Sequence, residues 1–147
     1  MPANPTGTEG ISTKVLIVED SAELCELIRE VLIAEGIEAR GITDSTEAAA
    51  CLRGEKFEAV FLDVHMSPPD GIELARQMRD SGANQNTPIV IITGEKDSGL
   101  MARAFQAGAN LFLFKPVDRM KLLRILRIIQ DPMDRARQQS HGGNVRS

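Results

Sequence analysis

Short apolar segments alternate with amphipathic segments along the central part of the chain. Polar residues, Gly or Pro bound the apolar segments, a pattern typical of strands buried on both faces. The predicted strands lie at 14–18, 37–42, 59–62, 88–92 and 111–114. In segment 37–42 apolar and polar residues alternate, which indicates a strand near the edge of a sheet.

The segments between the predicted strands repeat apolar residues at the spacing of one helix face. The predicted helices cover 21–35, 45–52, 70–79, 98–107 and 118–130. In the first helix the expected buried face is made by Leu24, Leu27, Ile28, Val31 and Leu32. Ser21 is placed to cap the start of this helix, and Gly36 is placed to end it.

Five strand–helix units in succession predict an α/β fold, in which helices cover both faces of a parallel sheet. The length of 147 residues suits one domain, which we place at residues 13–131. We expect a disordered arm at residues 1–12 and a flexible polar tail at residues 132–147. The tail is too short for an output domain, so the chain either acts alone or is a fragment of a larger regulator.

The composition narrows the range of functions. The net charge of −4 and the scarcity of aromatic residues, five Phe with no Trp or Tyr, argue against direct binding of nucleic acid. No apolar run has the length of a membrane span, and the first residues lack the layout of a signal peptide, so we expect a cytoplasmic protein that does not enter membranes. Cys25 and Cys51 fall within helical patterns and are expected to be small, buried and reduced thiols.

Four predicted strands end in polar side chains: Glu19 with Asp20, Asp63, Thr93 and Lys115. The carboxyl ends of parallel strands share one edge of a sheet, which is where ligands bind in open α/β folds. Three carboxylates at this edge would repel one another and attract a small hard cation, for which Mg²⁺ is the natural candidate. A carboxylate can also attack phosphorus. Taken alone, Asp63 could equally cap the following loop.

With these motifs in their order and spacing, residues 13–130 resemble a response-regulator receiver domain of two-component signalling, similar to the single-domain chemotaxis regulators. The motif set is the acidic pair Glu19–Asp20, then Asp63, Thr93 and the dipeptide Lys115–Pro116. The resemblance implies a flavodoxin-like, doubly wound sheet of five strands in the order 2-1-3-4-5.

The resemblance also implies roles for the acidic residues. Asp63 would accept a phosphoryl group from a histidine kinase or phosphotransfer protein. Asp20 and Asp63 would bind Mg²⁺ through their side chains, His65 through its backbone carbonyl, and Glu19 through water. The chain would then be a phosphoprotein rather than an enzyme with an external substrate, since it would catalyse only its own phosphorylation and slow dephosphorylation.

By the same resemblance, Lys115 would bind the phosphoryl group and Thr93 would be the switch hydroxyl. Phe112 would be the switch aromatic, and the Lys115–Pro116 bond would be cis. Helix 118–130 carries more apolar residues than one buried stripe needs. We therefore expect segment 98–129 to bind an unknown downstream partner, or a second copy in a homodimer, after phosphorylation of Asp63.

Other readings of the site stay open. An aspartate-nucleophile phosphatase usually has a second acid two residues after the nucleophile, where this chain has His65. A flavin-binding module would need a phosphate loop in place of Glu19–Asp20. A receiver-like interaction module that no longer uses phosphate would also share the fold. Ser67 lies where the family often has proline, and Pro68 follows it, so the loop after Asp63 is expected to take a different path.

Overall fold

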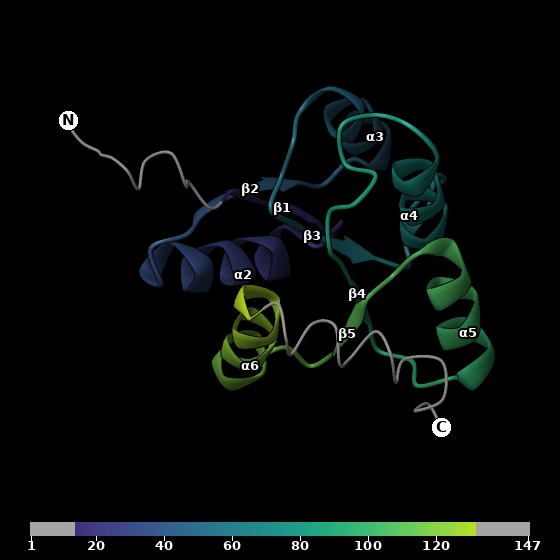
Figure 1. The fold of residues 1–147 in the computed structure, drawn as a ribbon. Coiled ribbons are helices and arrows are strands. Elements are labelled where there is room, and N and C mark those ends of the chain that lie inside the picture. Colours follow the sequence, from purple (N-terminus) through teal and green to yellow (C-terminus); the bar gives the residue numbers. More distant parts are fainter. Residues whose placement is uncertain (1–13, 132–147) are drawn as a thin grey trace.

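The computed structural model describes residues 14–131, a five-stranded parallel sheet with helices on both faces (Figure 1). The expectations for residues 1–12 and 132–147 lie outside the described residues. The strands are β1 (Lys14–Val18), β2 (Glu38–Ile42), β3 (Ala59–Asp63), β4 (Ile89–Thr93) and β5 (Leu111–Phe114). The helices are α2 (Ala22–Ala34), α3 (Ser45–Gly54), α4 (Gly71–Asp80), α5 (Ser98–Ala107) and α6 (Arg119–Gln130).

The strand order is β2-β1-β3-β4-β5, and all four neighbouring pairs are parallel, as predicted. The two faces of the sheet build two apolar clusters. One lies under α3, α4 and α5, and the other under α2 and α6, on opposite sides of the sheet in Figure 1. The central strand β3 is buried at every position because both of its faces are covered.

One prediction about the buried face of α2 was wrong. Leu27 is 41 % exposed, and Cys25 is buried in its place. The stripe that packs on the sheet is Cys25, Ile28, Val31 and Leu32. Ile28 lies near the middle of this stripe with Val31 and Leu32 on either side of it, whereas Leu27 lies about 100° round the helix from Ile28 and so outside the stripe. Cys25 and Cys51 are both free thiols, as expected; Cys25 is buried as expected, whereas Cys51 is only partly buried.

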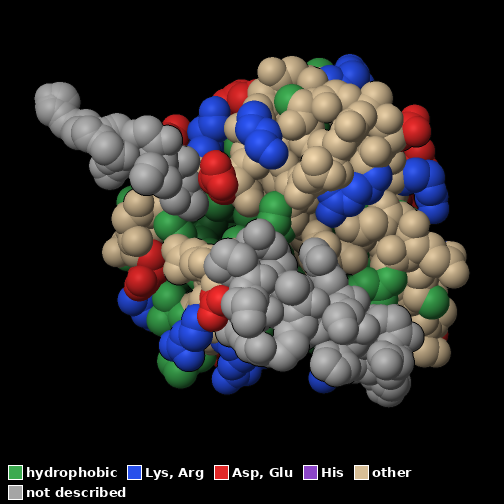
Figure 2. Space-filling view, viewed as in Figure 1, with side chains coloured by type: hydrophobic (Ala, Val, Ile, Leu, Met, Phe, Trp, Pro, Cys, Tyr) green, Lys and Arg blue, Asp and Glu red, His purple; other side chains and the backbone are tan. Residues whose placement is uncertain are grey.

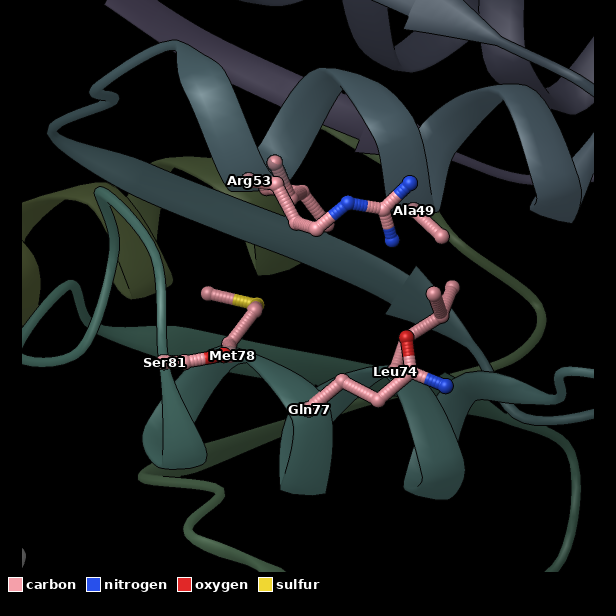
Figure 3. A pocket seen from close by; sticks show the side chains of 7 residues that line it. Ala49, Arg53, Leu74, Gln77, Met78 and Ser81 are labelled. Atoms are coloured by element: carbon pink, nitrogen blue, oxygen red, sulfur yellow. The ribbon is translucent and has the colours of Figure 1, made fainter.

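A cavity between α3 and α4 is lined by residues that include Arg53, Leu74 and Met78 (Figure 3). Its volume of about 10 Å³ leaves room for about one water molecule at most, so it is not a ligand site. Within residues 14–131, none of the helices has the length and apolar character needed to span a membrane.

Candidate functional site

The carboxyl ends of the strands bring the predicted polar residues together. Asp63 and Thr93 are the last residues of β3 and β4, while Glu19 and Lys115 directly follow β1 and β5. Glu19 and Thr93 are fully buried, and Asp63 is 1 % exposed. Buried polar side chains are costly unless something compensates them, so their gathering at one edge marks a functional site.

Three carboxylates form the centre of the site. Glu19, Asp20 and Asp63 each place an oxygen within 4.8 Å of the other two, and Asp20 is the exposed member. Burial, followed by the neighbouring Asp63, raises the pKa of Glu19 to about 7. The same causes raise the pKa of Asp20. Oε1 of Glu19 and Oδ2 of Asp63 are buried without a hydrogen-bond partner among the described residues.

Lys115 supplies positive charge beside these acids. Its Nζ lies 3.6 Å from Oδ1 of Asp63 and 3.7 Å from Oε2 of Glu19. The ammonium therefore faces the oxygen of Asp63 that also accepts a hydrogen bond from the backbone N–H of His65, at 3.1 Å. A buried nucleophile with one bonded oxygen, one unpartnered oxygen and an adjacent cation is suited to phosphoryl chemistry.

The loop from Asp63 to α4 is held from several sides. The hydroxyl of Ser45 at the start of α3 donates to the carbonyl of Ser67, at 2.7 Å. A Cβ atom on Gly71 would lie 2.4 Å from the carbonyl oxygen of Asp63, so only glycine permits this approach. The Pro68–Pro69 bond is cis, which we did not predict. The Lys115–Pro116 bond is cis, as predicted.

Thr93 lies on the opposite side of Asp63 from β1, because β4 pairs with β3 in the sheet. Its Oγ1 accepts a hydrogen bond from the backbone N–H of Glu95, at 3.0 Å. The Glu95 side chain reaches His65, with 3.2 Å between Oε2 and Nε2, and both side chains are exposed. This pair joins the loop after β3 to the loop after β4 across the mouth of the site.

Phe112 lies on β5, and its side chain is partly buried against one of the two apolar clusters. Its ring makes an edge contact with Phe105 of α5, at 5.1 Å between centroids, and stacks on Phe114 at 5.8 Å.

Two contacts at the site were not predicted from the sequence: the hydrogen bond from Ser45 to Ser67 and the pairing of Glu95 with His65. The signal for Glu95 was its place two residues after Thr93, but nothing in the sequence pairs Ser45 with Ser67.

A family model described as a response regulator receiver domain matches residues 15–127. The chain belongs to this family. The receiver domain is 30 % identical to the DNA-binding response regulator MtrA of Mycobacterium tuberculosis over 114 residues, which are 78 % of this chain and 49 % of that protein. It is also 35 % identical over 121 residues to the osmosensing histidine protein kinase SLN1 of Saccharomyces cerevisiae. This match covers 78 % of this chain and 10 % of that protein.

Solved structures agree with this assignment. The chemotaxis response regulator CheY4 of Vibrio cholerae has a TM-score of 0.76 at 28 % identity, covering 80 % of this chain and 98 % of that one. The receiver domain of a sensor histidine kinase from Pseudomonas aeruginosa, described with a magnesium ion in its active-site cleft, has a TM-score of 0.73 at 27 % identity, covering 82 % and 99 %. The chain spans about half the length of the mycobacterial relatives it matches.

Proposed function

We propose that this receiver domain is a phosphoaccepting switch, in which Asp63 takes a phosphoryl group from a phosphohistidine on a histidine kinase or phosphotransfer protein. The observation that carries the proposal is the Asp63 side chain, which is buried with Oδ2 unpartnered and Oδ1 3.6 Å from Lys115 Nζ. One oxygen of the Asp63 carboxylate bonds to phosphorus as the P–N bond of the phosphohistidine breaks, which leaves the other oxygen for a metal ion. The histidine leaves with the electron pair and takes up a proton.

Magnesium fits the donor set of this site. The orphaned oxygens of Glu19 and Asp63 and the exposed carboxylate of Asp20 are hard oxygen ligands. By the family resemblance, the backbone carbonyl of His65 would add another donor. When bound, the ion offsets the negative charge that three carboxylates and a phosphoryl group bring together. The magnesium reported for the Pseudomonas receiver domain supports this assignment.

Lys115 and Thr93 complete the proposed chemistry. The ammonium of Lys115 neutralises a phosphoryl oxygen, since it already lies beside the nucleophile. The hydroxyl of Thr93 turns from its bond with Glu95 to a phosphoryl oxygen. We propose no external substrate: the domain phosphorylates and slowly dephosphorylates only its own aspartate.

The output of the switch is proposed to be a change on the surface formed by α5, β5 and α6, which a downstream protein reads. Movement of Thr93 toward Asp63 leaves space into which Phe112 turns. MtrA is described as a DNA-binding regulator, and this chain matches about half of its length. For residues 14–131 we propose protein partners, and the absence of direct nucleic-acid binding stays a prediction.

Intact-mass analysis after incubation with acetyl phosphate and magnesium tests the proposal. The chain gains one phosphoryl group, and Asp63→Asn gains none because its amide is not a nucleophile. Asp44→Asn is the matched control, since Asn also caps helices well and Asp44 lies at the start of α3. Equal labelling of Asp63→Asn would reject Asp63 as the acceptor.

A further inference from the structure

The strand β2 lies at one edge of the sheet, and within the described residues β1 is its only neighbouring strand. The backbone N–H of Glu19 donates to the carbonyl of Ile42, so Ile42 directs its backbone groups toward β1. Successive residues of a strand direct these groups to opposite sides, so those of Ala39 and Gly41 face the open side. β2 therefore presents donors and acceptors with which another strand can pair.

A groove gives access to this edge from the side of α2. Its volume is about 400 Å³. Its lining includes Ala39, Arg40 and Gly41 of β2 and Glu26 and Arg29 of α2. Glu26 and Arg29 pair with each other at 3.0 Å, so they add no net charge to the groove. The groove shows that α2 leaves the edge of β2 uncovered.

The exposed side chains of β2 carry one charge of each sign. Glu38 and Arg40 are two residues apart and therefore lie on the same face of the strand. Arg40 pairs with Glu55 of α3, whereas none of the ion pairs within residues 14–131 includes Glu38. Where Figure 1 places β2, Figure 2 shows acidic and basic side chains side by side.

We propose that β2 pairs with β2 of a second copy of this chain, antiparallel and centred on Ala39, so that the two sheets join into one. In this register Glu38 of each copy lies opposite Arg40 of the other, and both cross-strand pairs are attractive. The two Ala39 residues exchange backbone hydrogen bonds at the two-fold axis, because both face the open side.

Backbone direction and charge together select this register. A shift of the second copy by one residue would set backbone groups that face the open side against groups that face β1. A shift by two residues sets Arg40 against Arg40 in one direction and Glu38 against Glu38 in the other. Like charges directly opposite one another destabilise a sheet. Of these registers, only the one centred on Ala39 matches both charges.

Charged side chains on an edge strand commonly prevent pairing between molecules. They have that effect in the two shifted registers, where each sign meets itself. An acid and a base two residues apart are instead complementary to their own copy in one antiparallel register. Glu38 and Arg40 therefore disfavour unspecific edge pairing and favour one symmetric dimer.

The chain's own residues 1–13 match this edge less well than a second copy does. They contain Pro2 and Pro5, which lack the N–H that a ladder of hydrogen bonds needs. Glu9 is their single charged side chain, so they offer no basic side chain to match Glu38.

The proposed dimer goes beyond the phosphoryl switch, because it involves neither Asp63 nor the surface formed by α5, β5 and α6. The two-fold axis reverses the strand direction in the second copy. The two candidate sites, at the carboxyl ends of their strands, then lie at opposite edges of the joined sheet. Pairing through β2 therefore needs no phosphoryl group and leaves both sites accessible.

Light scattering on the full, untreated chain over a wide range of protein concentrations tests the inference. The fraction of dimer rises with concentration, and amide hydrogen exchange at Ala39 and Gly41 slows as the dimer forms. Glu38→Arg lowers the association constant roughly tenfold, because both symmetric pairs then repel. Asp80→Arg makes the same charge change on α4, which packs against β3 and β4, and leaves the constant unchanged.

Exchange of the two charges supplies the decisive comparison. Arg40→Glu alone also weakens the dimer. An equimolar mixture of Glu38→Arg and Arg40→Glu forms a heterodimer, because two Arg of one chain face two Glu of the other. The double variant Glu38→Arg/Arg40→Glu restores the homodimer. Arg40→Glu loses the pair with Glu55, so circular dichroism checks that each variant is folded.

A monomer at every concentration, or a dimer that Glu38→Arg leaves intact, overturns the inference. So does a mixture of the two folded single variants that forms no heterodimer. Protection of Ala39 and Gly41 that does not depend on concentration also overturns it, since residues 1–13 would then be the strand that covers the edge. None of these outcomes bears on phosphorylation of Asp63, which the mass analysis tests separately.

Discussion

Glu19 is a fully buried carboxylate beside a second buried carboxylate, Asp63. Its pKa rises from the ordinary 4.5 to about 7 because burial, and then Asp63, disfavour the charged form. Between these values the folded chain holds a proton that the unfolded chain has lost. Stability without magnesium therefore falls as the pH rises from 4.5 to about 7, by about 3 kcal/mol.

Urea unfolding at a series of pH values, in the presence of a chelator, measures this effect. Glu19→Gln removes the titrating group and flattens the profile between the two pKa values. Glu47→Gln, an acid in the first turn of α3, keeps the slope of the parent. A slope that survives undiminished in Glu19→Gln would show that another group is responsible.

Asp20 is the exposed member of the carboxylate cluster, and its charge adds to the repulsion around Asp63. Asp20→Asn is expected to raise the melting temperature in the absence of metal, because it relieves that repulsion. It also weakens the stabilisation that magnesium gives to the parent by mass action. Thermal scans with and without magnesium check both effects, with Asp80→Asn at the end of α4 as the control. If magnesium did not change the melting temperature of the parent protein, the proposed magnesium site would be refuted.

The polar residues of the site could be predicted from the sequence because they are the residues at the ends of the predicted strands. The hydrogen bonds of the buried Asn84 side chain could not be predicted. Its side chain accepts from the backbone N–H of Phe57 and donates to the carbonyls of Leu52 and Glu55. These partners come from segments distant in the sequence, so the residue resembled any polar loop position.

At the scale of elements, every helix begins at a residue whose side chain accepts a hydrogen bond from the first turn. These caps are Ser21, Asp44, Asp70, Asp97 and Asp118. Such capping is local, which is why the helix starts followed from the sequence. The exposure of Leu27 depended on how α2 rotates against the sheet, and local signals do not fix that rotation.

Arg79, near the end of α4, connects this helix to the loop before β4 and to the turn between α5 and β5. Its guanidinium donates to the carbonyls of Gln85, Thr87 and Gly108 and to the side chain of Asn110. We expect Arg79→Met to destabilise the fold by about 2–3 kcal/mol, because several partly buried acceptors lose their donor. Phosphorylation of Asp63 should persist, because these contacts lie at the amino ends of β4 and β5, whereas Asp63 lies at the carboxyl ends of the strands.

Chemical denaturation checks this expectation, and Arg76→Met one turn earlier is the control. Arg76 makes an exposed ion pair with Glu73, so its loss should cost less than about 0.5 kcal/mol. Similar losses in the two variants would mean that the Arg79 contacts contribute little.

At the scale of the whole molecule, the sheet separates two apolar clusters, and the proposed switch surface lies at one edge of it. Addition of a beryllofluoride mimic of the phosphoryl group is expected to shift backbone NMR signals across residues 98–129 as well as around Asp63. The reason is that the proposed movement of Thr93 would change the packing of Phe112, whose ring now contacts Phe105 and Phe114. Shifts confined to the Asp63 pocket would exclude α5, β5 and α6 as the switch surface.

Gly71 sits where the first turn of α4 touches the backbone of Asp63. With 2.4 Å between a hypothetical Cβ and the Asp63 carbonyl oxygen, even alanine would push the helix and the strand end apart. No substitution of Gly71 is conservative, because every other amino acid adds at least that one carbon. A lineage that keeps the backbone of Asp63 in this place is therefore expected to keep glycine at position 71.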